Sequence, residues 1–236
     1  MILVALAGVG LTGYGLVTLF GYRSVLVPGR SMGTTVPVGA SVFYRVGATA
    51  ELHRGDLIVF EASAMDPLMA GRLLKRVVGV GGDAITCCDA QEGIQVNGKP
   101  VAEPYLQADQ PPLRQRPFSV KVPPDTVFVM GDVRDNSNDS RFHPENGHDG
   151  AIPLSKVDGV VVGHGTVFSF EPQTPTTAFA DAGLPGVSPV DSTYGTARWF
   201  VAGGVALFLL GVSGVIVSAA RSAGRRRKAA AAPPTR

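Results

Sequence analysis

The sequence predicts a mainly β domain of antiparallel sheets, flanked by a transmembrane helix towards each end of the chain. Short apolar runs with period-two alternation, broken by Gly, Pro and Asp, fill the middle of the sequence and favour strands over helices. Residues 1–22 and 199–220, by contrast, contain no charged side chain over 22 residues each. At a rise of about 1.5 Å per residue, a helix of that length spans a hydrocarbon core of about 30 Å.

The first apolar run, residues 1–22, is expected to be a transmembrane helix that is retained as an anchor. A cleaved signal peptide is the alternative interpretation. That alternative is disfavoured because no basic residue precedes the apolar stretch and no clear small-x-small cleavage site precedes Arg23.

The second apolar run, residues 199–220, is followed by a basic tail over residues 221–236. Arg221 and the basic cluster at 225–228 are typical of a cytoplasmic flank, which disfavours the alternative of a buried core helix. With the tail in the cytoplasm, two spans place both termini inside. We therefore expect a multi-pass protein of the cell membrane whose middle domain lies on the trans, extracytoplasmic side.

The charge of the middle domain argues against a nucleic-acid partner. The whole chain carries a formal net charge of +2, but six of its basic residues lie in the tail. Without them, 15 Lys and Arg stand against 19 Asp and Glu, a net charge of −4. Because binding to phosphates needs a basic face, we predict no nucleic-acid partner and expect the lipid bilayer to be the partner of the two apolar runs.

The middle domain is expected to extend over residues 23–170. Asn97-Gly98 indicates a hairpin within it, because both positions tolerate the positive φ of a type I′ turn. Residues 171–198, rich in Pro, Thr, Ser, Ala and Gly, are expected to form an irregular linker to the second span. The predicted strands are residues 41–45, 56–61, 73–80, 84–86, 94–96, 118–122, 126–130, 157–162 and 166–170.

The cysteines and histidines do not indicate a metal centre. Cys87 and Cys88 are adjacent, and a disulfide between neighbours is strained, so they are poor evidence for a structural staple and their redox state stays open. His143 and His148 flank a loop rich in Pro, Asn and Gly, and their spacing fits no ligand pair on a helix. We predict no metal and no cofactor.

Ser31 and Lys75 are the candidate catalytic residues. A serine hydroxyl is a poor nucleophile unless a base takes its proton, and no histidine lies in an obvious constellation. A lysine can be that base if it is neutral, which requires its pKa to fall from about 10.4 to about 7–8. The apolar pairs at 73–74 and 77–78 surround Lys75 and could lower its pKa by burial. On this run alone, a solvated lysine on an edge strand is an equally good interpretation.

The position of Ser31 favours a functional role for this residue over that of an ordinary serine in a turn. Serine is common in turn-rich segments such as residues 28–33. Ser31 nevertheless lies eight residues after Arg23, near the expected membrane surface, and glycines on either side allow a substrate to approach closely.

A charged loop, residues 131–141, directly follows the apolar run 126–130. Loops on a rigid scaffold commonly present functional side chains. Ser137 or Ser140 can hydrogen-bond a neutral lysine amine. The acidic residues of the loop can pair with arginines or be solvated and of little energetic value; the residues concerned are Asp132, Asp135 and Asp139, with Arg76, Arg134 and Arg141.

Taken together and in order, these segments resemble bacterial type I signal peptidase, the membrane-anchored Ser/Lys protease that removes signal peptides. The resemblance extends from the first apolar run to about Gly163. Four motifs carry it: Ser31-Met32 is similar to the nucleophile box, residues 55–60 to a structural strand, residues 75–83 to the box of the lysine base, and residues 131–141 to the last box. Asn97-Gly98-Lys99 and Glu103-Pro104-Tyr105-Leu106 are typical of the family's variable middle.

The resemblance implies roles for individual residues. Ser31 would be the nucleophile, its backbone N–H would meet the oxyanion, and Lys75 would be the general base. Some members add a hydroxyl two residues before the nucleophile, but Gly29 has none. The supporting roles implied are Ser137 as the hydroxyl that orients the lysine, Asp139 and Arg141 as residues that hold the loop with Arg76 as their partner, and Met32 beside the substrate pocket.

Three positions depart from the family pattern. Thr34 and Gly81 stand where proline is usual, and Val133 stands where asparagine is common. None removes an implied catalytic group, but each is expected to loosen the local backbone, since proline fixes φ and glycine frees it.

The implied function is that of a monomeric membrane-bound serine endopeptidase, signal peptidase I, which cleaves N-terminal signal peptides from exported preproteins after small-x-small sites. Self-cleaving repressors also use a Ser/Lys dyad, but they lack membrane spans. The alternative from another class is a catalytically impaired, membrane-tethered homologue that binds peptides.

Overall fold

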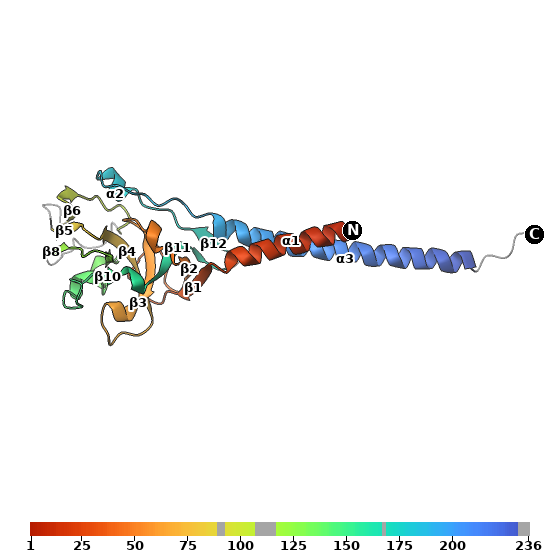
Figure 1. Cartoon of the computed structure of the whole chain (residues 1–236), viewed down its shortest axis with the longest axis horizontal. Helices are drawn as coiled ribbons and strands as arrows, with labels where there is room; N and C mark the ends of the chain where they lie inside the picture. Colours follow the sequence, from red (N-terminus) through yellow and green to blue (C-terminus); the bar gives the residue numbers. More distant parts are fainter. Residues whose placement is uncertain (89–92, 107–116, 167–168, 231–236) are drawn as a thin grey trace, which may run out of the picture. The chain divides into compact units, whose positions relative to one another are not determined.

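A computed structural model of the chain describes residues 1–88, 93–106, 117–166 and 169–230 (Figure 1). It contains two compact units. One consists of Met1–Gly21 together with the chain from Thr193 onward, and the other is Tyr22–Ser192. We describe each unit by itself.

The first unit pairs helix α1, Ile2–Leu19, with helix α3, Thr193–Ala230. Both are long and apolar enough to cross a membrane by length and composition. The two predicted spans therefore coincide with helices. Helix α3 is longer than predicted, because the Ala, Arg and Lys residues of the basic tail are strong helix formers and continue it to Ala230.

Glycines set the distance between the two helices. A Cβ atom added to Gly8 would lie 2.6 Å from the Gly204 carbonyl oxygen, and one added to Gly211 would lie 2.5 Å from the Ala5 nitrogen. Gly8 contacts the region of Gly204 whereas Gly15 contacts that of Ala197, so the helices run antiparallel. Small residues at such contacts let helix backbones approach closely, as in membrane helix pairs.

The second unit is built on two antiparallel sheets. The larger sheet has the strand order β1-β2-β11-β3-β4-β9-β10, with β12 paired to β11. Its strands are β1 Tyr22–Leu26, β2 Ser41–Val46, β3 Leu57–Glu61, β4 Arg72–Val80, β9 Thr126–Met130, β10 Ile152–Pro153, β11 Val157–Gly165 and β12 Phe170–Pro172. The smaller sheet, ordered β7-β6-β5-β8, consists of β5 Ala84–Cys87, β6 Ile94–Val96, β7 Lys99–Pro100 and β8 Phe118–Lys121.

Short helices fill the connections of this unit. They are the 3₁₀ turns η1 Ala48–Glu51, η2 Ala62–Ala64, η3 Arg134–Asn136, η4 Ser140–Phe142 and η5 Leu154–Lys156, and the single-turn helix α2 Ala178–Asp181.

The predicted class, mainly antiparallel β with an apolar helix towards each end, is confirmed. Eight predicted strands coincide with observed ones within two to three residues at their ends. Asn97 and Gly98 have φ values of 54° and 75°, as the predicted type I′ turn requires. The ninth prediction, 166–170, falls partly on residues 167–168, which lie outside the described residues, and β12 begins at Phe170. The trans-side location stays a prediction.

Residues 171–198 differ from the irregular linker that their composition suggested. Phe179 is 1% exposed, and with Leu184 it belongs to the hydrophobic cluster under the smaller sheet. Lys99 Nζ donates to the Gly183 carbonyl over 2.5 Å, and Arg54 donates to the Pro185 carbonyl over 3.0 Å. Because composition averages over a segment, two buried apolar side chains within it left no signal.

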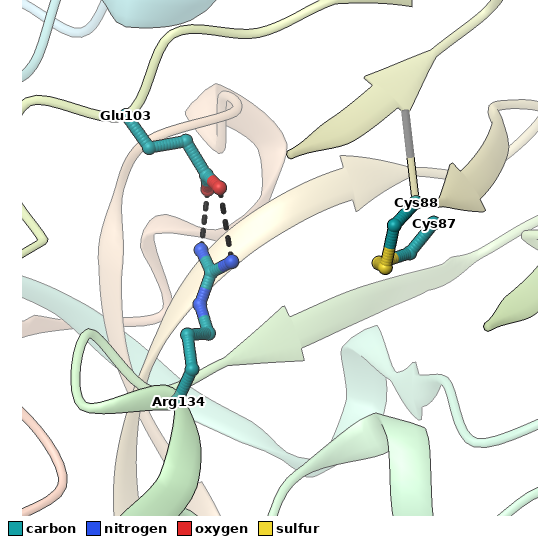
Figure 2. The surroundings of a disulfide bond; sticks show 4 residues. All are labelled: Cys87, Cys88, Glu103 and Arg134. Carbon is teal, nitrogen blue, oxygen red and sulfur yellow. Dashed lines mark hydrogen bonds and ion pairs between the residues drawn. A yellow bond between two sulfur atoms is a disulfide. The ribbon is translucent and has the colours of Figure 1, made fainter. Parts of the chain in front are cut away.

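Cys87 and Cys88 are joined by a disulfide at the end of β5 (Figure 2). The sequence alone had left the redox state of these two cysteines open. Because the two residues are neighbours, the bond connects no separate segments of the chain, and it adds no tie between the two sheets.

Candidate active site

Ser31 and Lys75 meet at the centre of the larger sheet. Lys75 lies on β4, between β3 and β9, in register with Ile58. Ser31 lies in the turn that follows β1. Lys75 Nζ is 2.7 Å from Ser31 Oγ, and Lys75 is only 3% exposed. The edge-strand interpretation of Lys75 is therefore wrong, because β4 is paired on both sides.

The surroundings of Lys75 favour a neutral amine. Burial lowers the pKa of Lys75 from its ordinary 10.5 to about 8, although the Asp139 and Asp132 carboxylates work in the opposite direction. A neutral amine offers a lone pair to the serine hydroxyl, whereas an ammonium only donates. Near its pKa the Lys75 amine can take a proton and return it.

The charged loop holds the backbone of Ser31. The Val133 N–H donates to the Ser31 carbonyl oxygen over 2.9 Å. A Cβ atom added to Gly131 would lie 2.7 Å from that same oxygen. Glycine at position 131 thus allows the loop to approach the turn that contains Ser31. Val133 contributes its backbone, so its departure from the family pattern removes none of these contacts.

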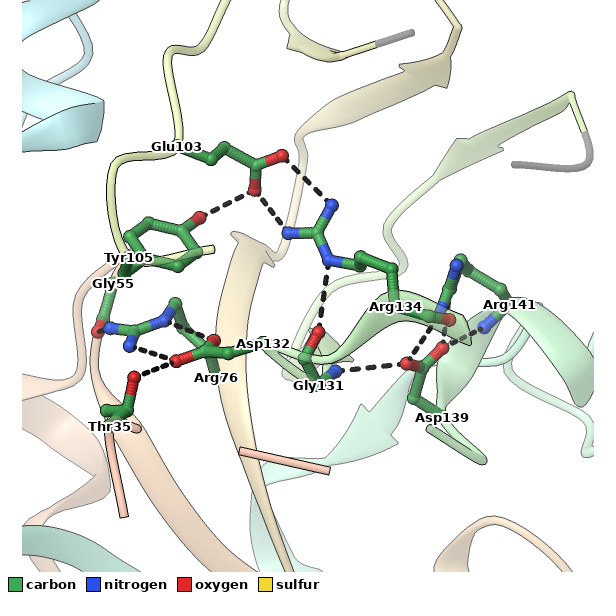
Figure 3. A network of polar contacts seen from close by, with 10 residues as sticks. All are labelled: Thr35, Gly55, Arg76, Glu103, Tyr105, Gly131, Asp132, Arg134, Asp139 and Arg141. Carbon is green, nitrogen blue, oxygen red and sulfur yellow. Dashed lines mark hydrogen bonds and ion pairs between the residues drawn. The ribbon is translucent and has the colours of Figure 1, made fainter. Parts of the chain in front are cut away.

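Asp132 links three parts of the site (Figure 3). Its carboxylate accepts hydrogen bonds from Arg76 Nε and Nη2 over 2.8 and 2.6 Å, and from the Thr35 hydroxyl over 2.6 Å. Arg76 also donates to the Gly55 carbonyl over 2.8 Å. Although burial opposes the charge, hydrogen bonding to Asp132 holds the pKa of Arg76 above its ordinary value. The turn that contains Ser31, the strand that carries Lys75 and the loop are therefore joined at one carboxylate.

Asp139 and Arg141 pair within the loop. Asp139 is fully buried and accepts from Arg141 Nε over 2.8 Å and Arg141 Nη2 over 2.9 Å. It also accepts from the Gly131 N–H over 3.0 Å. Arg76 was expected to join this pair, but it binds Asp132 instead, because its register opposite Met130 places it beside the start of the loop.

Ser137 does not make the expected hydrogen bond to Lys75. Its hydroxyl is buried against Gly131, and within the described part of the chain it has no hydrogen-bond partner. The other candidate hydroxyl, on Ser140, accepts from the Val129 N–H over 3.0 Å. The position of Ser137 in the loop places it near the site, as predicted. The sequence does not determine the rotamer of its side chain, so it could not predict the missing hydrogen bond.

Met32 lies in the core rather than on an open surface. It is 1% exposed and belongs to the hydrophobic cluster that also contains Val36, Leu57 and Leu74. Gly29, in contrast, has open space where a side chain would be.

The remaining departures are accommodated by the fold. Thr34 is exposed, in the turn that contains Ser31. A Cβ atom at Gly81 would lie 3.1 Å from the Pro123 carbonyl oxygen and 3.2 Å from the Pro124 Cα, so glycine there lets two turns pack closely.

Sequence reasoning assigned no role in the site to Thr35, Glu103 or Tyr105. Glu103 and Tyr105 were noted only as part of a motif of the family's variable middle. The contacts of the three residues with Asp132, Arg134 and Arg76 join segments far apart in the chain, so no local sequence pattern predicts them. Among residues 1–88, 93–106, 117–166 and 169–230, we find no group of three His, Cys, Asp or Glu side chains that could hold a metal ion.

The sequence matches one family. A family model described as signal peptidase, peptidase S26, matches residues 1–164. Signal peptidase I S of Bacillus subtilis (strain 168) is 35% identical over 136 residues, which cover 53% of this chain and 70% of that protein. Signal peptidase I of Mycobacterium tuberculosis is 40% identical over 100 residues, covering 37% of this chain and 34% of its own length. A crystal structure of a signal peptidase I from Enterococcus faecalis V583 has 24% identity and a TM-score of 0.36, covering 46% of this chain and 95% of that one.

Proposed function

The chain belongs to the signal peptidase family, peptidase S26, and from that premise we propose that it removes N-terminal signal peptides from exported preproteins with a Ser31–Lys75 dyad. As a member of this family it is a serine endopeptidase. The observation that carries the proposal for the dyad is the 2.7 Å contact between the buried Lys75 amine and the Ser31 hydroxyl.

The chemistry follows from that contact. Neutral Lys75 takes the Ser31 proton while Oγ attacks the scissile carbonyl carbon. The tetrahedral oxyanion is met by the Ser31 backbone N–H. When the C–N bond breaks, the Lys75 ammonium protonates the leaving amine and an acyl-enzyme remains. Lys75 then takes a proton from water, the hydroxide attacks the acyl carbon, and the proton returns to Ser31.

We propose that the substrate binds as an extended strand, a β-augmentation mode. Strand β1 lies at the edge of the larger sheet and leads directly to the Ser31 turn, so its outer backbone groups are placed for such pairing. Small side chains one and three residues before the cleaved bond would fill shallow apolar pockets. Met32 and its cluster would form the floor of the pocket nearest Ser31.

The supporting residues would hold this geometry. In this proposal, Arg76 with Asp132, and Asp139 with Arg141, position the loop that binds the Ser31 carbonyl. The Ser137 hydroxyl would orient the lysine amine during turnover, after a change of rotamer.

The two apolar helices support a membrane protein, and we propose the topology that the basic tail favours. Both termini would be cytoplasmic and the sheet unit extracytoplasmic, where exported preproteins emerge. The protein would act as a monomer with no nucleic-acid partner.

The test is cleavage of a small-x-small peptide by the full chain in detergent. Ser31→Ala and Lys75→Ala are expected to lose activity by a factor of about 10³ or more, since both members of a dyad act as a unit. Lys121→Ala, at an exposed lysine of β8, is the matched control and should retain activity. If both dyad variants cleave like wild type, the mechanism is wrong. If wild type itself neither cleaves nor reacts with an acylating β-lactam-type probe, the chain is an impaired peptide-binding homologue.

A further inference from the structure

We infer that Glu103 and Tyr105, two residues of the segment between the strands β7 and β8, are positioning residues that hold the catalytic loop against Ser31. This inference rests on the proposed role of Ser31 and adds the parts that keep it in place. Both act through arginines that bind the loop, Glu103 through Arg134 and Tyr105 through Arg76 (Figure 3).

Glu103 holds the first of these arginines. Its carboxylate accepts two hydrogen bonds from the Arg134 guanidinium, one of them 2.9 Å long. The side chains of Arg134 and Glu103 are 1% and 4% exposed. Although burial opposes the charge, the Glu103 carboxylate holds the pKa of Arg134 above its ordinary range. A bidentate pair that is this deeply buried fixes orientation as well as charge.

Arg134 transmits this orientation to the loop. Its Nε donates to the Gly131 carbonyl oxygen over 3.0 Å. Gly131 begins the stretch whose third residue, Val133, donates to the Ser31 carbonyl. Glu103 is thus connected to the nucleophile backbone through one side chain and three loop residues.

Tyr105 holds the second arginine. The guanidinium of Arg76 lies 4.0 Å from the centre of the Tyr105 ring, and the same guanidinium binds Asp132 of the loop. The Tyr105 hydroxyl donates to Glu103 over 2.6 Å. Burial keeps the pKa of Tyr105 well above its ordinary value, so this hydroxyl stays a donor. The segment that contains Glu103 and Tyr105 therefore contacts both Arg134, which binds Gly131, and Arg76, which binds Asp132.

One buried ion pair, between Arg54 and Asp83, lies outside this connection. Arg54 and Asp83 form a pair of similar burial, with side chains 10% and 4% exposed. The Asp83 carboxylate accepts hydrogen bonds from Arg54, the Val80 N–H and Asn97, and none of these belongs to the loop. Asp83→Asn is therefore a matched control, because it breaks a buried pair without touching residues 131–134.

The experiment separates positioning from stability in the full chain. Titration with an acylating β-lactam-type probe counts the folded, reactive sites, and kcat is then expressed per titrated site. For Glu103→Gln we expect the per-site kcat to fall about 10- to 100-fold with KM changed less than about threefold, as for a small misplacement of a reacting group. Asp83→Asn should lower Tm but keep the wild-type per-site kcat.

A second variant distinguishes a loss of positioning from a loss of stability. Glu103→Leu combined with Arg134→Met removes both buried charges, so its Tm should recover relative to Glu103→Gln. Its per-site kcat should stay low, because Arg134→Met removes the donor to the Gly131 carbonyl. Hydrogen exchange at the Val133 amide should quicken at least about tenfold in Glu103→Gln and not in Asp83→Asn, since local opening exposes that bond.

The outcomes are distinct. A wild type that the probe does not acylate overturns the proposed function and this inference with it. A wild type that titrates normally, with Glu103→Gln matching Asp83→Asn in per-site kcat and in exchange at Val133, overturns this inference alone. Recovery of kcat together with Tm in the double variant does the same.

Discussion

Replacing Lys75 by methionine is expected to abolish cleavage and, at neutral pH, to stabilise the sheet unit. Lys75 is 3% exposed, and burial lowers its pKa from 10.5 to about 8. At about 1.36 kcal/mol per pKa unit, such a shift corresponds to about 3 kcal/mol of lost stability at pH values below 8. Methionine fills a similar volume without a charge. It gives up one hydrogen bond to Ser31, worth about 1 kcal/mol, so we expect a net gain of about 2 kcal/mol.

The gain should depend on pH in a fixed direction. The unfolded chain keeps its lysine proton up to a pH of about 10.5, whereas the folded chain releases it near pH 8. Between these values the unfolded state binds more protons, so the stability of the wild type rises with pH. The advantage of Lys75→Met should be complete below pH 8 and fade over the same window.

The assay is urea unfolding in detergent, followed by circular dichroism at pH values near 7 and near 10, with the free energy extrapolated to zero urea. Lys121→Met, at the exposed lysine of β8, is the control and should change stability little at either pH. A Lys75→Met chain less stable than wild type near neutral pH, or equally favoured at both pH values, would refute the reasoning.

Three further predictions concern the same site. Peptide cleavage, measured as kcat/KM, should rise about tenfold per pH unit up to the Lys75 pKa of about 8 and level off above it, because the neutral amine is the active form; a profile flat from pH 6 to 9 would contradict this. Gly131→Ala should lose most activity, because the added Cβ would lie 2.7 Å from the Ser31 carbonyl oxygen; probe titration and kcat check it, and wild-type acylation rates would sink the idea. Asp132→Asn should lower the free energy of unfolding by about 3 kcal/mol, since the Arg76 side chain, 2% exposed, would be left without its carboxylate; urea unfolding measures it, and a change within about 0.5 kcal/mol would show that the pair contributes little to stability.

Most of the strands could be predicted from the sequence, because period-two alternation and short apolar runs mark them. The apolar run at 126–130 became β9, whose five residues are all buried. Strand β1, residues 22–26, was missed because it begins directly after the first apolar helix and mixes exposed and buried positions. The short strands β7 and β10 have two residues each, too few for any period to show.

The site was readable only as a set of candidates. Lys75 could be an edge or an interior lysine until the pairing of β4 with β3 and β9 decided between them. From the sequence, Arg76 could have paired with any of the three aspartates of the loop. The strand register, which sets Arg76 opposite Met130, places it beside Asp132. Glu103 lies 31 residues before Arg134, beyond the reach of any local pattern. Partner choice over such separations is a property of topology, which a single sequence does not display.

The junction at Asp132 has a consequence for when the protein becomes a protease. Ser31 and Lys75 are 44 residues apart, and the Thr35–Asp132 bond spans 97 residues. A ribosome adds Ser31 first, Lys75 next and Asp132, whose carboxylate joins their segments, last. A growing chain that ends before β9 contains both side chains, but it lacks the Val133 N–H that binds the Ser31 carbonyl and the Asp132 carboxylate that binds Thr35 and Arg76. We therefore expect the proposed dyad to become competent for hydrolysis only after Asp132 has been made.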